Sequence, residues 1–485
     1  MSSKSTIAFV FPGLVDHVDP TLPVCRGLVQ MGWQVEYICD TNFRDAIEET
    51  GAIFHDVDEI CAQHGMTSLE MLISDCLDSY DDSSAKTWGT KFGSIAVKIL
   101  TDVFMDVFRR IAPKVVVYCP IRCPYAHFAS QSLKLKDVSL LTKPGPGFVT
   151  RELSQRGQTP SEIIEKLKTN TANIKAMDSL RFLLDKRLSL NTSLPLFHEY
   201  YTQLNLVAKL QSLADPLSET DACVFFAQGK KFEFVGFLQN DSTEDDDETR
   251  CPELFAEIAI ASRLRSDIIY ISMGTLLTGE DPDYGWSAYA GDNLLSGKEI
   301  CHAIYSVIFR ELGEWVPRPL VILAVGNQLD ALPDLKIPEN CWCLPTLPQQ
   351  QVLQKARPSL FITHGGDIAF MEALSVGSPM IVCPCHRNDF ANAKCAEKLG
   401  VGVQVHVPCC RTDDFGPDDP TEAFKASFSE ALDTMLGTSR RSYKWRSQAL
   451  SDEIRDSGGA QRAVELIQEL MPRSKRATLQ SKYGI

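Results

Sequence analysis

Residues 361–380, FITHGGDIAFMEALSVGSPM, contain the pattern that decides the fold of this chain. An apolar strand is predicted to end at His364, a pair of glycines predicts a turn, and a helix is predicted from Gly366 to Val376. This order of elements presents free backbone N–H groups and a helix dipole to an anion. His364 can donate one more hydrogen bond there, and Glu372 can accept hydrogen bonds from a sugar hydroxyl. The alternative interpretation is a structural turn followed by a surface glutamate.

The same alternation of short apolar strands and helices extends on both sides of this stretch. In the N-terminal half, strands are predicted at 6–11, 34–39 and 114–118, and helices at 20–32, 43–50 and 95–112. In the C-terminal half, strands are predicted at 267–272, 320–324, 359–363, 380–383 and 401–405, and helices at 299–312, 366–376 and 389–399. Strands that alternate with helices predict a parallel sheet covered on both faces. The fold class is therefore α/β, with two domains.

An acidic run separates the two halves. Residues 240–249, NDSTEDDDET, have no apolar side chain, which predicts a solvated linker. The alternative, a cation site, lacks the glycine turn and ligand spacing of an EF-hand. Residues 150–215 are predicted to be helical, and 278–296 to form an ordered surface insertion. We predict an N-terminal domain at 1–238, a linker at 239–252, a C-terminal domain at 253–440 and final helices at 441–472.

The composition excludes several classes of protein. The chain of 485 residues has 48 basic and 63 acidic side chains, a formal net charge of −15, which repels nucleic acids and anionic membranes. No apolar run approaches the roughly 18–20 residues that span a bilayer, and Ile7–Phe11 is too short for a signal-peptide core. The sixteen cysteines lack paired zinc spacing. They predict reduced thiols and a cytoplasmic location.

A set of motifs within residues 341–405 resembles the donor-binding segment of family 1 nucleotide-sugar glycosyltransferases, which have the GT-B fold. These motifs are Pro348-Gln349, His364-Gly365-Gly366, Glu372-Ala373-Leu374, Gly377-x-Pro379, Pro384, Asn392-Ala393 and Gly400-x-Gly402. Residues 270–275, YISMGT, resemble the strand and turn that open the family's second domain. Residues 12–23 resemble the loop that carries its catalytic histidine. Residues 60–230 match the family poorly.

The resemblance implies a fold, an activity and a set of site residues. The fold is GT-B, with two Rossmann-like domains whose parallel sheets face a cleft, and helices 441–472 cross back to the first domain. The activity is inverting transfer of a hexose from a UDP-sugar, with UDP-glucose the expected donor, to a hydroxyl group of a hydrophobic small molecule. No metal and no other cofactor take part.

His17 is the general base that the resemblance implies. Its position after the first strand lies where parallel sheets build ligand sites, and an unperturbed pKa near 6.5 suits proton abstraction. A lone loop histidine is otherwise exposed or structural. The donor-binding residues implied are Ser272, Thr275 and His364 with Gly366 near the diphosphate, Gln349 and Thr346 near uracil, Glu372 on the ribose, and Asn388 and Asp389 on the sugar.

The chain departs from the family pattern at positions that matter for catalysis. Cys119 stands where the family usually has an aspartate that orients the histidine, and Asn388-Asp389 replaces an Asp-Gln pair. Thr346 stands where an aromatic residue often stacks on uracil. Two further hypotheses therefore stay open: a nucleotide-sugar-binding protein that has lost catalysis, and a GT-B sugar-nucleotide epimerase.

Other clusters carry weaker signals. Trp88, Phe92, Phe104 and Phe108 are at helix-like spacings, which predicts core packing rather than an acceptor pocket. His386-Arg387 is either solvated or part of the donor site. The remaining histidines that we considered belong to no recognisable motif in the sequence: His55, His64, His127 and His198.

Overall fold

A computed structural model describes residues 5–66, 94–143, 145–146, 200–214, 229–239, 251–274, 287–290, 293–326, 332–384, 387–405 and 420–471. The chain forms two compact units. Unit 1 comprises Met1–Asn240 and Ser457–Ile485, and unit 2 comprises Asp241–Asp456. The acidic run at 240–249 lies outside the described residues, and so do Trp88 and Phe92.

The described part of unit 1 is built on a parallel sheet of seven strands in the order β3-β2-β1-β4-β5-β6-β7. The strands are β1 (Thr6–Val10), β2 (Gln34–Cys39), β3 (Ile53–Asp56), β4 (Val115–Tyr118), β5 (Lys136–Leu141), β6 (Leu204–Val207) and β7 (Lys231–Phe234). The order places β1 beside β4, with Val10 opposite Tyr118. Loops that follow β1 and β4 therefore meet at one edge of the sheet, although about 100 residues separate them in the chain.

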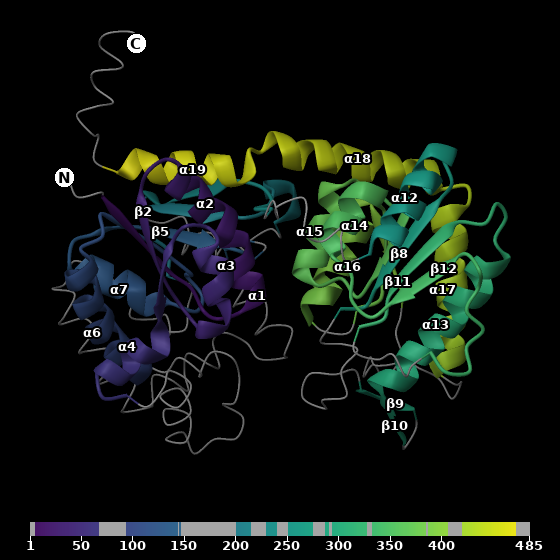
Figure 1. Cartoon of the computed structure of the whole chain (residues 1–485), viewed down its shortest axis with the longest axis horizontal. Coiled ribbons are helices and arrows are strands. Elements are labelled where there is room, and N and C mark those ends of the chain that lie inside the picture. Colours follow the sequence, from purple (N-terminus) through teal and green to yellow (C-terminus); the bar gives the residue numbers. More distant parts are fainter. Residues whose placement is uncertain are drawn as a thin grey trace, which may run out of the picture. The chain divides into compact units, whose positions relative to one another are not determined.

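Helices connect and cover these strands. They are α1 (Val15–Val18), η1 (Asp19–Thr21), α2 (Leu22–Gln30), η2 (Thr41–Phe43), α3 (Arg44–Glu48), α4 (Val57–Gln63), α6 (Ser94–Ile111), α7 (Pro124–Ser132), η4 (Gln211–Leu213) and α19 (Gly459–Leu470). The last helix, α19, packs beside α2, as Figure 1 shows. A Cβ atom at Gly27 would lie 2.8 Å from Cγ2 of Val464, so this glycine allows the two helices to approach closely.

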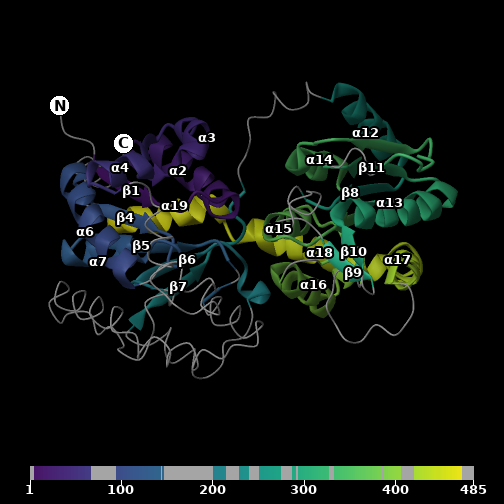
Figure 2. The same cartoon turned by 90° about the horizontal axis from the view of Figure 1, so that it is seen from below.

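The core of unit 1 is apolar and continuous. Strands β1 and β4 are buried along their whole length, as expected for a sheet covered on both faces. Helices α6 and α7 lie side by side (Figure 2). Phe104 and Phe108 of α6 are 0% and 1% exposed and contact each other edge to face. Their predicted role in the core is confirmed.

The described part of unit 2 has a parallel sheet of six strands in the order β12-β11-β8-β13-β14-β15. The strands are β8 (Ile268–Ser272), β11 (Leu320–Ala324), β12 (Cys341–Leu344), β13 (Leu360–Thr363), β14 (Met380–Val382) and β15 (Gly402–Gln404). β9 (Ser287–Ala290) and β10 (Asn293–Ser296) form a separate antiparallel hairpin. Thr363 pairs with Ser272, so the loops after β8 and β13 are neighbours.

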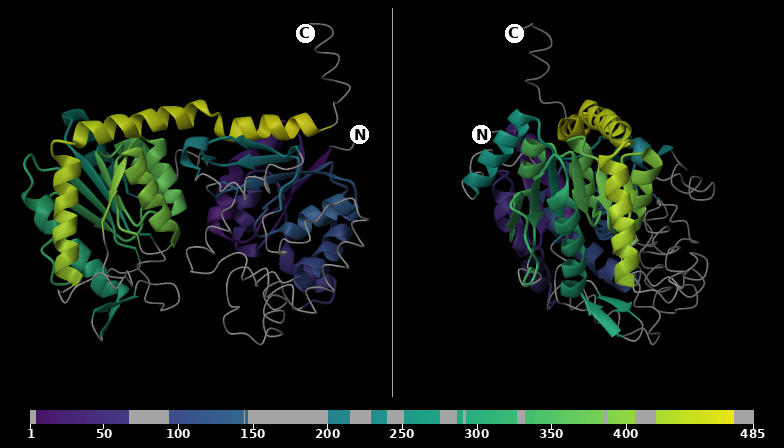
Figure 3. Two further views of the ribbon diagram at one scale, coloured as in Figure 1. Left: turned by 180° about the vertical axis from the view of Figure 1, so that it is seen from behind. Right: turned by 90° about the vertical axis from the view of Figure 1, so that its right-hand side faces the viewer.

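The helices of unit 2 are α12 (Pro252–Leu264), α13 (Gly297–Glu314), α14 (Gln349–Ala356), α15 (Asp367–Ser375), α16 (Arg387–Leu399), α17 (Pro420–Leu436) and α18 (Arg440–Asp456). α17 packs beside α13, and Figure 3 shows the pair from two sides. α18 packs against α15, where the Ser451 hydroxyl donates to the carbonyl of Ser375 at 2.6 Å. Arg440 makes a two-pronged contact with the Asp267 carboxylate just before β8.

The prediction of α/β architecture with parallel sheets is confirmed, and the strands at 34–39 and 320–324 have the predicted bounds. The helical prediction for 150–215 is wrong where the structure describes the chain, because Leu204–Val207 forms strand β6. Asn205 obscures the strand pattern in the sequence. Its side chain can be fully buried because all of its polar groups are hydrogen-bonded. The Ser139 hydroxyl donates to the amide oxygen, and the amide nitrogen donates to the carbonyls of Thr202 and Lys231. Among the described residues, no helix is long and apolar enough to cross a membrane.

Candidate functional site

His17 lies at the C-terminal edge of the sheet of unit 1. β1 ends at Val10, and the loop that follows leads into the short helix α1. Gly13 allows this loop to approach the end of β2, because a Cβ atom there would lie 2.3 Å from Cβ of Asp40. The Thr21 hydroxyl donates to the Val18 carbonyl at 2.7 Å, which closes the turn after the histidine. The imidazole is thereby held in a buried position, 1% exposed.

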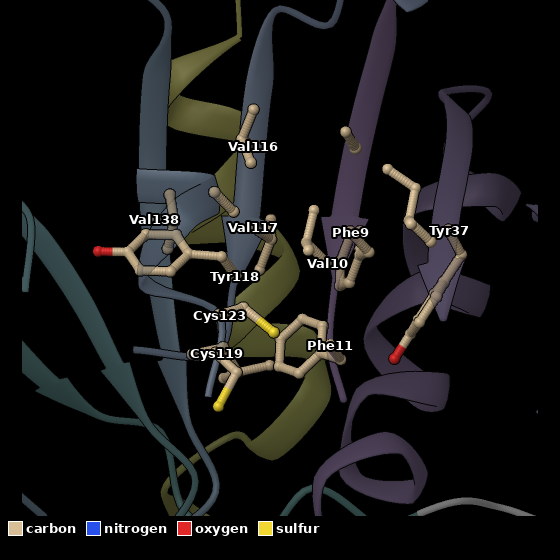
Figure 4. Packing of buried hydrophobic residues seen from close by; sticks show 14 of the residues in the cluster. Phe9, Val10, Phe11, Tyr37, Val116, Val117, Tyr118, Cys119, Cys123 and Val138 are labelled. Atoms are coloured by element: carbon tan, nitrogen blue, oxygen red, sulfur yellow. The ribbon is translucent and has the colours of Figure 1, made fainter. Parts of the chain in front are cut away.

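The thiol of Cys119 faces His17 across this edge. Cys119 directly follows β4, and its Sγ lies 3.4 Å from Nδ1 of His17. Figure 4 shows Cys119 next to Phe11, beyond the ends of β4 and β1. Burial raises the pKa of the Cys119 thiol to about 11, so the group is neutral at pH 7. The structure therefore brings together the two residues that the sequence linked only through the family pattern.

A buried lysine supports the same loop. Lys143 is 4% exposed, and its ammonium group forms an ion pair with Asp16, the residue before His17. Lys143 follows β5, so its contact ties a third strand end to α1. The sequence analysis missed this pair. A lysine just after an apolar strand was the available signal, but its partner is distant in the chain.

Two apolar side chains just before His17 are exposed. Leu14 and Val15 precede it and are 40% and 54% exposed. Burial and the neighbouring Asp16 carboxylate raise the pKa of Asp19 to about 6, which still leaves this carboxyl group mostly ionised at pH 7. An apolar ligand can bury Leu14 and Val15 without desolvating a strong charge at those two positions.

A second polar cluster in unit 1 has a structural role. Nδ1 of His127 lies 2.7 Å from the Asp137 carboxylate, and both side chains are buried. Tyr118 and Tyr200 stack against the same imidazole, and the Tyr118 hydroxyl donates to the Tyr200 carbonyl at 2.7 Å. The cluster fixes the segment that leads into β6. The sequence did not reveal it, because its members come from four separate segments.

In unit 2, His364 is wedged between two glycines. It follows β13, and Gly274 follows the neighbouring strand β8. A Cβ atom at Gly274 would lie 2.5 Å from Cε1 of His364, and one at Gly366 would lie 2.4 Å from Nε2. Only glycine at both positions leaves room for the ring. Gly366 is also the N-cap of α15, so the imidazole lies at the positive end of a helix.

The turn that carries His364 is fixed by its neighbours. Gly365 has a φ of +91°, and a Cβ atom there would lie 2.5 Å from Cγ1 of Val382. The Asn392 amide donates to the Gly365 carbonyl at 2.8 Å and to the Asp367 carboxylate at 3.1 Å. These contacts hold the N-terminus of α15 in place. They account for the glycine and asparagine types at these positions of the motif.

Gln349 and Glu372 form a second pair further along α15. Nε2 of Gln349 donates to Oε2 of Glu372 at 2.7 Å, and both side chains are half-buried. Glu372 is six positions beyond Gly366, a distance of about 9 Å along the helix axis. Tyr270 of β8 lies nearby, fully buried and stacked on Phe361, and burial with the Glu372 carboxylate raises its pKa above the usual value.

The remaining predicted donor residues are placed as follows. Ser272 ends β8 and is 9% exposed, and Thr346 is exposed in the loop before α14. Asp389 is 4% exposed, and its backbone carbonyl lies beside Gly365. Thr275, His386 and the side chain of Asn388 lie outside the described residues. Within the ranges that the structure describes, no group of three or more histidine, cysteine, aspartate or glutamate side chains is arranged to hold a metal ion.

Part of the chain is similar to known glycosyltransferases. Residues 329–417 match the family model described as UDP-glucoronosyl and UDP-glucosyl transferase. The NDP-glycosyltransferase YjiC of Bacillus licheniformis is 32% identical over 151 residues, which are 31% of this chain and 34% of that relative. UDP-glycosyltransferase 85A7 of Arabidopsis thaliana is 30% identical over 142 residues, 27% of this chain and 26% of that relative. The chain thus matches these two curated relatives over only 34% and 26% of their length.

The fold extends over nearly the whole chain. The crystal structure of the glycotransferase of kitacinnamycin superposes with a TM-score of 0.63 at 19% identity, covering 97% of this chain and 100% of that one. The calicheamicin glycosyltransferase CalG4 gives 0.63 at 18% identity, covering 98% and 100%. The chain therefore has the GT-B fold. Its resemblance to family 1 glycosyltransferases is confirmed, and the family match lies in unit 2.

Proposed function

We propose that this protein transfers a hexose from a UDP-sugar to a hydroxyl group of a hydrophobic small molecule, with inversion at the anomeric carbon. The observation that carries the proposal is the imidazole of His364, wedged between Gly274 and Gly366 at the N-terminus of α15. A helix N-terminus with a histidine beside it suits a diphosphate. This arrangement lies in the segment that matches the family model.

Each further part of the reaction has a candidate group. The Gln349–Glu372 pair is proposed to bind the nucleoside, since amide and carboxylate groups can form hydrogen bonds with uracil and ribose hydroxyls. His17 is the proposed general base for the acceptor hydroxyl. The exposed Leu14 and Val15 support an apolar acceptor. UDP-glucose is the proposed donor and acts as a co-substrate, with no other cofactor, and the cytoplasmic location stays a prediction.

Incubation with nucleotide sugars and acceptors tests the function. Purified protein receives UDP-glucose, other UDP-sugars or dTDP-glucose with a library of hydroxylated aromatic and aliphatic compounds. Release of UDP together with a product heavier by one hexose residue supports transfer. Saturable binding without product supports the second candidate, a nucleotide-sugar-binding protein, which the neutral Cys119 beside His17 favours. Nucleotide release with no heavier product indicates hydrolysis or an epimerase-like elimination.

UDP binding is expected to be independent of divalent metal. Backbone N–H groups of α15 and the His364 side chain supply the positive potential that a cation would otherwise provide. Titration of the protein with UDP by calorimetry, with and without EDTA, should give the same dissociation constant. Loss of binding in EDTA and its return with magnesium would show that this interpretation of the turn is wrong.

Asp389→Ala is expected to weaken sugar transfer much more than it weakens UDP binding. The proposed contact of this carboxylate is with sugar hydroxyls, and the nucleotide does not share it. Turnover and UDP affinity are measured on the same preparation, with Asp389→Asn as the variant that keeps the side-chain volume. Because Asp389 lies beside the Gly365 turn, equal losses of both properties would indicate that it supports the turn and does not contact the sugar.

A further inference from the structure

Two neighbouring thiols lie on strand β12, at Cys341 and Cys343. Side chains two positions apart in a strand point to the same face of the sheet, and the two sulfur atoms lie 3.7 Å apart. Both side chains are half-buried, so a small reagent can approach them, and both thiols are free. The pair is separate from the residues proposed above for the general base and for the donor site.

The hydrogen bond between the two sulfurs makes them chemically unequal. It lowers the pKa of Cys343 and raises the pKa of Cys341. Cys343 therefore has more thiolate character than an isolated thiol, and the thiolate is the form that attacks an oxidant. Cys341 keeps its proton and lies beside it. A nucleophilic cysteine next to a second thiol that can displace its oxidised product is the usual arrangement of an oxidation-sensitive pair.

A disulfide between the two residues requires β12 to shorten. At a rise of about 3.3 Å per residue, Cα atoms two positions apart in a strand are separated by about 6.6 Å. Disulfides prefer a Cα separation of about 5.5–6 Å and need the sulfurs at about 2.05 Å. Among the strands that the structure describes, β12 pairs with β11 alone. Only one neighbouring strand in that set therefore opposes the change.

The shortening is transmitted toward the segment that carries Gln349. The start of β12 is anchored, because the Asn340 amide donates to the Pro319 carbonyl at 2.8 Å. At the other end of the strand, the Leu344 carbonyl accepts a hydrogen bond from the Val325 N–H at 2.9 Å. Gln349 begins α14 five positions later. A shorter β12 therefore pulls on this hydrogen bond and on the loop that leads to Gln349.

We propose that Cys341 and Cys343 are oxidised by hydrogen peroxide to a reversible disulfide, and that this modification weakens UDP binding. The effect on UDP rests on the donor site proposed above, whereas formation of the disulfide does not. First, the Cys343 sulfur attacks a peroxide oxygen, the O–O bond breaks, and water leaves with the thiol proton, which gives a sulfenic acid. The Cys341 sulfur then attacks this sulfur, the S–O bond breaks, and a second water leaves. The two thiols lose two electrons, and the peroxide gains them.

Reduction should restore the donor site. A disulfide whose preferred geometry the strand resists is more easily reduced, and strained or exposed disulfides are the labile ones. The reduced pair fits the regular register of β12, in which Trp342, between the two cysteines, lies opposite Ile322 of β11. The pair therefore returns to the form that binds UDP when a thiol reductant is present.

Peptide mass tests the modification directly. Cleavage by trypsin after Lys336 and Lys355 releases fragment 337–355, in which Cys341 and Cys343 are the only cysteines. After treatment with hydrogen peroxide and then iodoacetamide, this fragment should carry no alkyl group and be two hydrogen atoms lighter than the reduced peptide. Dithiothreitol should reverse the change. A fragment that still takes up two alkyl groups after peroxide treatment would overturn the proposal.

Calorimetric titration with UDP tests the consequence. The dissociation constant is expected to rise at least about tenfold in the oxidised protein and to return after dithiothreitol. Cys341→Ser and Cys343→Ser cannot close the disulfide, so each should bind UDP as the reduced wild type does, before and after peroxide. Cys251→Ser is the matched control. It removes a half-buried thiol just before α12 and should leave the response to peroxide unchanged.

The outcomes distinguish this proposal from the proposed function. A disulfide at 341–343 with an unchanged dissociation constant for UDP would overturn the link to the donor site. So would an equal loss of UDP affinity in peroxide-treated Cys341→Ser, because another oxidised group would then be responsible. If the serine variants fail to fold, the peptide mass and the UDP affinity of the wild type decide. Reduced wild-type protein that binds no nucleotide sugar would instead overturn the proposed function, and the peptide mass would still test the disulfide.

Discussion

Replacing His17 by alanine is expected to lower the turnover of sugar transfer by about 10²-fold or more on alcohol acceptors, the usual scale of general-base loss. The side chain lies at the strand edge with Nδ1 3.4 Å from the Cys119 sulfur, and Nε2 is the atom proposed to take the acceptor proton. The loss should shrink on acidic phenols, because these arrive partly ionised. Turnover is measured at saturating UDP-glucose with one alcohol and a series of phenols.

The control for this variant is His64→Ala. His64 is an exposed histidine of unit 1 whose ring contacts the Ile60 carbonyl at the end of α4, away from the strand edge that carries His17. It should retain full turnover. Both variants are checked for folding by thermal unfolding, since His17 is buried and its loss leaves a cavity. A folded His17→Ala protein with undiminished turnover on an aliphatic alcohol would remove His17 from the mechanism.

Gly274→Ala is expected to weaken UDP binding by about tenfold or more, which corresponds to about 1.4 kcal/mol. The new methyl group would lie 2.5 Å from Cε1 of His364, so the imidazole must leave its place at the N-terminus of α15. A diphosphate would then lose the histidine hydrogen bond. Calorimetric titration with UDP measures the effect, and transfer activity should fall in parallel.

Gly32→Ala is the matched control, because it separates backbone strain from the displaced ring. Gly32 has a φ of +89°, close to the +78° of Gly274, but no atom lies within 4 Å of its added Cβ. In both variants the left-handed backbone conformation should lower the free energy of unfolding by roughly 1–2 kcal/mol. Only Gly274→Ala should lose UDP affinity. Unchanged affinity in a folded Gly274→Ala protein would mean that the His364 ring does not contact the diphosphate.

Much of the fold could be predicted from local patterns. A continuous apolar run such as Leu320–Ala324 predicts a buried parallel strand, because a strand covered on both faces needs apolar side chains along its length. The stretch at 361–380 predicted a strand, turn and helix, and the structure has them with Gly365 in the left-handed region. Strand β6 was missed because Asn205 breaks the pattern. Its side chain is satisfied by Thr202, nearby in the chain, and by Ser139 and Lys231 on other segments.

The candidate site depends more strongly on contacts between distant segments. The sequence indicated His17 and His364 because each lies in a segment that resembles a motif of the family. It did not indicate that Gly274 must be glycine because His364 occupies its side-chain space, or that Lys143 holds Asp16. These facts follow from strand order. β8 lies beside β13, so the loops after them touch although about 90 residues separate them.

The contact between His17 and Cys119 also depends partly on the sequence and partly on the tertiary structure. The residue types and the alternation of strands and helices were already evident in the chain, and they were enough for the fold class and for a candidate base. The two residues are 102 positions apart, and they meet because a parallel sheet places β1 directly next to β4. The neutral state of the thiol is likewise a property of burial at that edge. The sequence alone does not show which residues become neighbours or how far each is removed from solvent, because the packing of the folded chain determines both.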